Sequence, residues 1–114
     1  MAITQAVANS FKTQVLTAVH NFTATTGDTF KIALFTNSAT LNKSTTVYDS
    51  TDNEVSGTGY TAGGNSLTSV TPVLSTDTAV CDFADSSWST ATITARGALI
   101  YNSSESDKAV VALD

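Results

Sequence analysis

The chain has 114 residues and a net charge of −5, and this length suits one domain, 1–114, with no room for a second. Only 13% of its residues are charged, and five Lys and Arg side chains are too few to hold a phosphate backbone, which disfavours a nucleic-acid partner. The single cysteine, Cys81, excludes an internal disulfide, and we expect a buried, inert thiol.

The amino terminus lacks the early positive charge of a secretory signal, because Lys12 is the first basic residue. No apolar stretch is long enough to span a membrane, so the sequence predicts no membrane partner. Polarity comes mainly from 21 Thr and 14 Ser. Because threonine favours strands, we expect a sheet with a hydroxyl-rich surface.

The first segment has helical periodicity, and we assign 1–24 to a helix. At 100° per residue its apolar side chains fall on one arc, which predicts one amphipathic helix. The polar stretch 23–29, which contains Gly27, is expected to end it. His20 falls on the polar arc near the helix C-terminus, so we expect it at the surface or as a cap. The apolar positions are Ile3, Ala6, Val7, Phe11, Val15, Ala18, Val19 and Phe22.

Residues 28–114 are predicted to be rich in β-strands. The run 30–36 alternates, which indicates a strand with one face beneath the helix, and Phe35 on the other face indicates that this side is covered too. The stretch 37–54 is mostly polar and is expected to be a long loop with at most one short strand.

Further strands are predicted after the glycine-rich run. Residues 66–74 and 78–83 suit a hairpin with its turn at 75–77, and Pro72 places the first of them at an edge or a bulge. Residues 91–95 and 98–101 are strand candidates, with a bulge or bend expected at Gly97. The last apolar run, 109–113, has no turn or polar tail after it, so we expect the natural chain to continue and this one to be truncated.

Four of the six glycines lie close together, between Gly57 and Gly64. The run 57–62 matches the dinucleotide fingerprint in form, but no buried strand precedes it and no helix former follows it, so we interpret it as a structural loop. A cluster of glycines indicates a backbone path that needs positive φ or close approach. We predict an interface at this loop and at the tryptophan beyond it, with Gly57, Gly59, Tyr60, Gly63, Gly64 and Trp88 as its candidate residues.

Other candidate sites are weak in this sequence. Acidic loops could hold calcium or form a carboxylate pair for glycoside hydrolysis, but they lack EF-hand spacing and a visible cleft, so solvated turns are the favoured interpretation. A catalytic triad around His20 has no specific support. We therefore predict no catalytic residue, no metal and no cofactor. The acidic residues concerned are Asp49, Asp52, Glu54, Asp82 and Asp85.

The aromatic side chains leave two alternatives open. Trp88, Tyr60 and Tyr101 could form a platform for stacking a sugar or an anchor at an interface. Core packing is the favoured interpretation for Trp88 and Tyr101, whereas Tyr60, with glycines nearby, is equally suited to its own sheet or to a neighbouring subunit.

Several runs, in their order and spacing, resemble a family of small virion structural proteins from tailed bacteriophages, including marine ones. The resemblance covers nearly the whole chain and supplies no catalytic residue. The runs that carry it are 11–12, 30–36, 53–60 through Gly64, 82–83 with Trp88, and 94–102.

The resemblance implies a capsid decoration or head or tail component that acts by subunit association, without catalysis. Its partners would be other virion proteins and copies of itself, and its location the virion, assembled in the host cytoplasm. The alternative is a carbohydrate- or receptor-binding β module of a phage tail. The expected fold is mainly β with one N-terminal helix, as an antiparallel β-sandwich or curled sheet of six to eight strands with the helix packed on one face.

Overall fold

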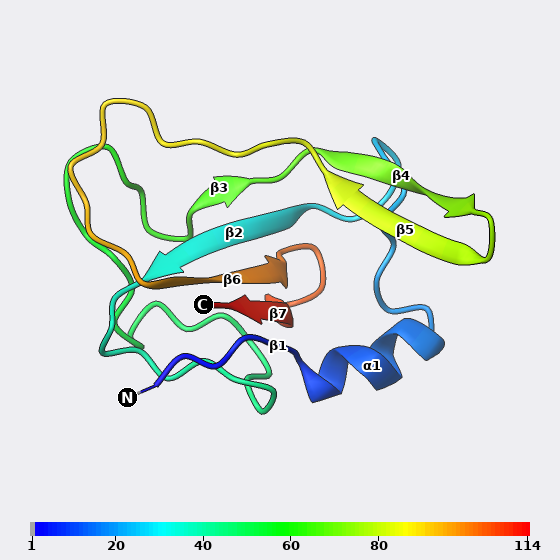
Figure 1. Cartoon of the computed structure of the whole chain (residues 1–114), viewed down its shortest axis with the longest axis horizontal. Helices are drawn as coiled ribbons and strands as arrows, with labels where there is room; N and C mark the ends of the chain where they lie inside the picture. Colours follow the sequence, from blue (N-terminus) through cyan, green and yellow to red (C-terminus); the bar gives the residue numbers. More distant parts are fainter. Residues whose placement is uncertain (1) are drawn as a thin grey trace.

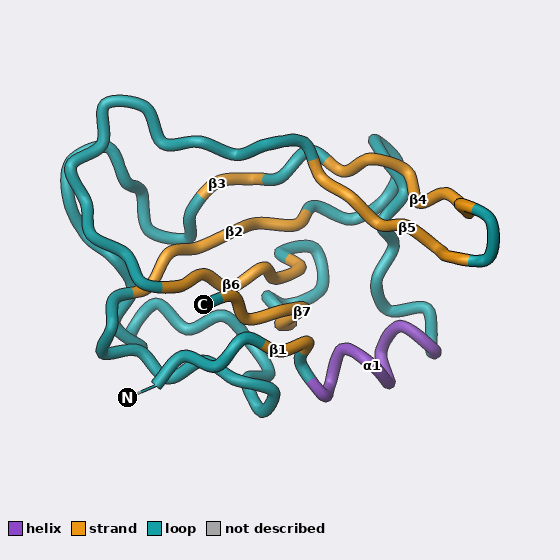
Figure 2. Tube along the Cα trace, viewed as in Figure 1, coloured by secondary structure: helices purple, strands orange, loops and turns teal. Residues whose placement is uncertain are grey.

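A computed structural model describes residues 2–114. It contains one helix and seven strands, and five of the strands form an open antiparallel sheet in the order β1-β7-β6-β2-β3 (Figure 1). The remaining two, β4 and β5, form a separate hairpin that extends from one end of the molecule (Figure 2). The prediction of a mainly β fold with one N-terminal helix is confirmed. The elements are β1 Ala6–Val7, α1 Asn9–Leu16, β2 Phe30–Phe35, β3 Asn65–Ser66, β4 Ser69–Ser75, β5 Thr78–Phe83, β6 Gly97–Asn102 and β7 Lys108–Leu113.

The predicted helix over 1–24 is too long at both ends. Its first part is extended instead, because Ile3 pairs with Leu41 and β1 joins the edge of β7. At the other end, the N–H of Val19 bonds to the Gln14 carbonyl oxygen at 3.0 Å, and Ala18 takes a positive φ of 61°. This is a Schellman closure, with alanine where glycine is usual, so the sequence carries no helix-stop signal there.

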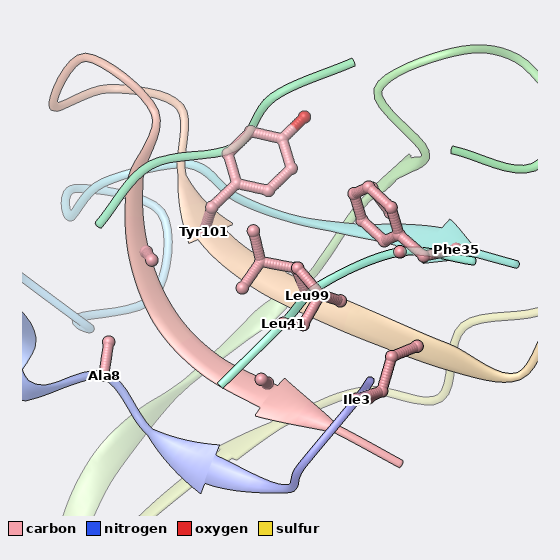
Figure 3. Packing of buried hydrophobic residues seen from close by; sticks show 10 residues of the cluster. Ile3, Ala8, Phe35, Leu41, Leu99 and Tyr101 are labelled. Carbon is pink, nitrogen blue, oxygen red and sulfur yellow. The ribbon is translucent and has the colours of Figure 1, made fainter. Parts of the chain in front are cut away.

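The core lies on one face of the sheet, under the long loop 37–54. Phe35 is fully buried there beside Leu99 and Tyr101, and Leu41 from the loop packs over them (Figure 3). The expectation that the Phe35 side of β2 is also covered is confirmed. Within the loop, single bridges at Leu41, Val47 and Glu54 tie it to the sheet and to the N-terminal segment.

The strand predictions after the glycine run are confirmed in part. The expected strand 66–74 is two strands, since β3 pairs with β2 while β4 pairs with β5. The register shift between Val70 and Val73 confirms the bulge expected at Pro72. A bulge or bend was expected at Gly97: the chain bends one residue earlier, at Arg96, but Gly97 begins β6 in regular pairing, and the register shift on β6 falls between Ile100 and Tyr101.

The predicted strand 91–95 is also wrong. This segment is extended, but its only bridge joins Thr92 to Thr58 of the glycine run. The run offers few hydrogen-bonding partners, because two of its glycines turn there with positive φ: Gly57 at 154° and Gly59 at 86°. The segment 91–95 therefore has the composition of a strand but no neighbouring strand to pair with.

Among residues 2–114, no helix has the length and apolar character needed to cross a membrane.

Gly64 is the tightest backbone contact of the glycine run. It has a φ of 78°, and a Cβ placed on it would lie 1.8 Å from the carbonyl oxygen of Ile32 in β2. Gly63 has a similar φ of 93°, but the nearest atom to its Cβ would be the mobile Lys31 Nζ at 3.3 Å. The two glycines therefore separate steric exclusion from backbone strain.

We predict that Gly64→Ala lowers the free energy of unfolding by about 3 kcal/mol or more, because β2 must shift to admit the methyl group. Gly63→Ala is the matched control and should cost only about 1 to 2 kcal/mol, the strain of a left-handed alanine. Urea unfolding followed by tryptophan fluorescence measures both. Equal losses in the two variants would contradict the close packing of Gly64 on β2.

Candidate functional site

The glycine run folds over a carboxylate. Glu54 Oε1 accepts a hydrogen bond from the Tyr48 hydroxyl at 2.5 Å, and Oε2 accepts one from the Tyr60 hydroxyl at 2.6 Å and one from the Gly63 N–H at 2.7 Å. The Tyr101 hydroxyl donates to the Gly63 carbonyl oxygen at 2.7 Å. We call these five residues, Tyr48, Glu54, Tyr60, Gly63 and Tyr101, the Glu54 cluster.

The aromatic rings of the Glu54 cluster are packed as well as hydrogen-bonded. Tyr48 stacks on Tyr101 with ring centroids 4.6 Å apart and planes 10° apart. The Tyr60 hydroxyl also accepts a hydrogen bond from the N–H of Leu34 in β2 at 2.9 Å. These polar atoms are thus hydrogen-bonded within the protein, which is typical of a structural network and not of a reactive site.

The tyrosines of the cluster resist ionisation. Burial, followed by the hydrogen bond to Glu54, raises the pKa of Tyr48 and of Tyr60 above the ordinary value of 10.0. Burial, followed by the negative charges of Asp107 and Glu54, raises the pKa of Tyr101 to about 12. A phenol held protonated in this way donates its hydrogen bond over the whole physiological pH range.

The predicted interface residues are brought together only in part. Tyr60 and Trp88 stack with centroids 6.2 Å apart and planes 30° apart, and both are half-buried. Gly57 and Gly59 are exposed, whereas Gly63 is buried and Gly64 packs on β2. Tyr60 therefore uses its hydroxyl inside its own molecule and presents its ring beside Trp88. Core packing is confirmed for Tyr101, which is 2% exposed.

The acidic loops do not converge. Asp49 accepts hydrogen bonds from the backbone N–H and hydroxyl of Thr51, and Asp52 accepts one from the N–H of Thr40, as in ordinary turns. Within residues 2–114, no group of three or more His, Cys, Asp or Glu side chains is placed to hold a metal ion.

His20 is buried, so the predicted surface or capping position is wrong. The helix ends at Leu16, and the following chain turns the imidazole inward to 9% exposure. Asn102 Nδ2 donates to His20 Nδ1 at 3.0 Å, and His20 Nε2 then donates to Gln14 Oε1 at 2.9 Å. Asn102 Nδ2 also donates to Asp28 Oδ2 at 2.8 Å. This network ties the helix to the end of β6.

Burial lowers the pKa of His20 below 6.5, against the opposing effect of Asp28 and Glu105 and with a smaller contribution from Lys108 in the same direction. Its neutral form fits the network, because Nδ1 must stay unprotonated to accept the hydrogen bond from Asn102. The buried, neutral imidazole of His20 therefore has a structural role at the edge of the core.

Cys81 is exposed, so the predicted buried thiol is also wrong. It belongs to β5 of the hairpin, in which nearly every residue is exposed. Sequence reasoning failed here because an apolar strand such as 78–83 predicts burial by a second layer. Partial burial, followed by the charge of Asp82, still raises the pKa of the Cys81 thiol above 9.0.

Comparison of the chain with protein-family models, with curated proteins and with solved structures finds no match.

We predict that Glu54→Gln lowers the free energy of unfolding by about 2 kcal/mol, because the amide nitrogen it introduces cannot accept the hydrogen bonds that the cluster donates. Glu105→Gln is the control, since the same change of charge falls on a side chain without such donors, and it should cost less than about 0.5 kcal/mol. Chemical unfolding at pH 7 measures both. A Glu54→Gln variant as stable as the control would contradict a stabilising role of the Glu54 cluster.

The His20 network predicts a loss of stability on acidification. Because the folded pKa is lowered, the contribution of His20 is complete above the unfolded pKa of about 6.5 and is lost as the pH falls through the folded value. As the chain has one histidine, the resonance of its Cε1 ring proton in the folded protein is assigned without ambiguity and should titrate below 6.5. A midpoint at or above 6.5 would contradict the buried neutral form.

Proposed function

We propose that this chain is a structural protein of a bacteriophage virion, a capsid decoration or a head or tail component, which acts by associating with copies of itself and with other virion proteins and has no catalytic role. The observation that carries the proposal is large apolar surface left uncovered by the chain itself. Leu74 is 73% exposed, Val73 60% and Leu16 86%. Val73 and Leu74 are neighbours in β4, and large exposed apolar side chains that gather on one element mark interaction sites in soluble proteins.

Two further features support the proposal. The polar groups of the Glu54 cluster and the His20 network bond to one another. The ordered runs at 30–36, 53–64 and 94–102 are similar to those of small tailed-phage virion proteins. The assignment to a virion, with assembly in the host cytoplasm, rests on that similarity.

A second candidate function is carbohydrate or receptor binding at a phage tail. The observation that favours it is the stacked, half-buried pair of Tyr60 and Trp88, because flat aromatic faces suit the apolar face of a sugar ring. The pair also retains the predicted interface as a proposal, with Gly57 and Gly59 exposed at its side.

The virion proposal predicts that the chain copurifies with phage particles. Gradient-purified particles of the phage that encodes it, digested and analysed by mass spectrometry, should contain its peptides at a level comparable with other structural proteins. Particle-free lysate of the same infection is the control fraction. Confinement of the peptides to that soluble fraction would contradict a virion role.

Glycan-array binding separates the second candidate from the first. If the Tyr60 and Trp88 pair binds sugar, wild-type protein should label defined glycans, and Trp88→Ala should weaken the signal at least about tenfold, the cost of one stacked aromatic anchor. Leu16→Ala, an exposed apolar change on the helix, is the matched control. An array without signal for wild-type protein would remove this candidate.

A further inference from the structure

The β4–β5 hairpin, which we call the arm, carries apolar side chains on both of its faces. Strand pairing sets Leu74 opposite Ala79 on one face and Val73 opposite Val80 on the other. Val73 is 60% exposed and Val80 40%. Two-stranded hairpins are marginally stable alone in water, and an arm with apolar side chains on both faces is suited to being enclosed.

A groove runs between the arm and α1, over the second face of the sheet. Its volume is about 600 Å³, and it has no charged side chain in its lining. Val7 of β1, Phe11 of α1 and Ile100 of β6 belong to its floor and far wall, while Cys81 and Phe83 belong to the arm itself. In Figure 1, β5 and α1 lie at the same end of the molecule, and the groove lies between them.

The molecule exposes more surface than its size requires. A folded chain of 11.8 kDa is expected to expose about 5,900 Å², whereas this one exposes 6478 Å². Its radius of gyration is 14.1 Å, against about 13.3 Å for a compact domain of 114 residues. The surplus of roughly 600 Å² is close to the area, about 800 Å², that each partner buries in a standard interface.

Charge selects the occupant of the groove. The net charge of −5 opposes association between copies of this chain, and contact through uncharged surface adds no close pair of like charges to that repulsion. The groove lining is uncharged, and the only charged side chains of the arm, Asp77 and Asp82, lie at its turn and on the face away from Ala79 and Cys81. The arm has no basic residues, and its face with Leu74 and Ala79 is uncharged, so this face suits the uncharged groove. This chain carries both the arm and the groove.

We propose that the groove between the arm and α1 receives the arm of a second copy of this chain, so that the subunit association in the proposed function, on which this inference rests, takes place here and not at the glycine run. The exposed tip, with Val73, Leu74 and Val80, supplies the side chains that are buried. Each copy thereby covers surface that neither can cover alone.

Light scattering coupled to size-exclusion chromatography tests this with Leu74→Lys, which places a charge at a side chain that is 73% exposed and so spares the fold. Val47→Lys is the matched control, since Val47 is 45% exposed on the opposite loop. Wild-type protein and the control should associate equally, and Leu74→Lys should raise the dissociation constant at least about tenfold.

The thiol of Cys81 gives an independent readout, because it lines the groove. Its rate of alkylation by N-ethylmaleimide in wild-type protein should fall as the protein concentration rises, and in Leu74→Lys it should stay fast throughout.

The other outcomes distinguish failure of this inference from failure of the proposed function. Association unchanged in Leu74→Lys but lost in Trp88→Ala would move the interface to the glycine run and leave the proposed function standing. A monomer at every concentration would overturn the arm exchange, and cosedimentation of that monomer with phosphatidylcholine vesicles would assign the groove to lipid. Arm-dependent association of a chain found only outside phage particles would retain the inference and overturn the virion role.

Discussion

The close approach of the glycine run to strand β2 is the constraint on which the rest of the structure depends. At Gly64 the backbone passes so near the Ile32 carbonyl that no side chain fits between them. One residue earlier, Gly63 offers its N–H to Glu54 and its carbonyl oxygen to Tyr101. The glycine run therefore joins the loop 37–54 to the sheet through backbone groups. A greater distance between the run and β2 would leave these donors and acceptors unpaired.

The glycine run and the loop that it holds cover one face of the sheet and leave part of the other face exposed. On the first face of the sheet, the loop and the Glu54 cluster bury Phe35, Leu99 and Tyr101 completely (Figure 3). On the second face, the aromatic rings of Phe22, Phe30 and Phe83 pack together near the base of the arm. Beyond them the apolar surface continues without cover. The buried core cluster lies on the first face, so the domain can carry an apolar groove on the second.

Sequence patterns predicted those elements whose partners are local or whose alternation is strict. The strand from Phe30 and the hairpin around Pro72 follow from alternation and turn chemistry, and β2 and β4–β5 confirm them. The predicted bounds of the helix were wrong because pairing of β1 with β7 overrides helical periodicity, and because Ala18 closes the helix without a glycine. The Glu54 cluster was missed because its residues meet only after the glycine run folds back; the cluster of glycines was the one signal available in the sequence. His20 and Cys81 were misplaced for the related reason that their surroundings are set by the helix end and by an arm with no covering layer.

The sheet buries its core within one chain, whereas we propose that the arm is covered by a second copy. Amide hydrogen exchange at low and at high protein concentration tests it most directly, because it reports each strand separately. The account predicts that amides of β2 and β6 exchange slowly at both concentrations, while those of β4 and β5 exchange fast in dilute solution and at least about tenfold more slowly in concentrated solution. Arm amides with the same exchange rate at both concentrations would contradict it.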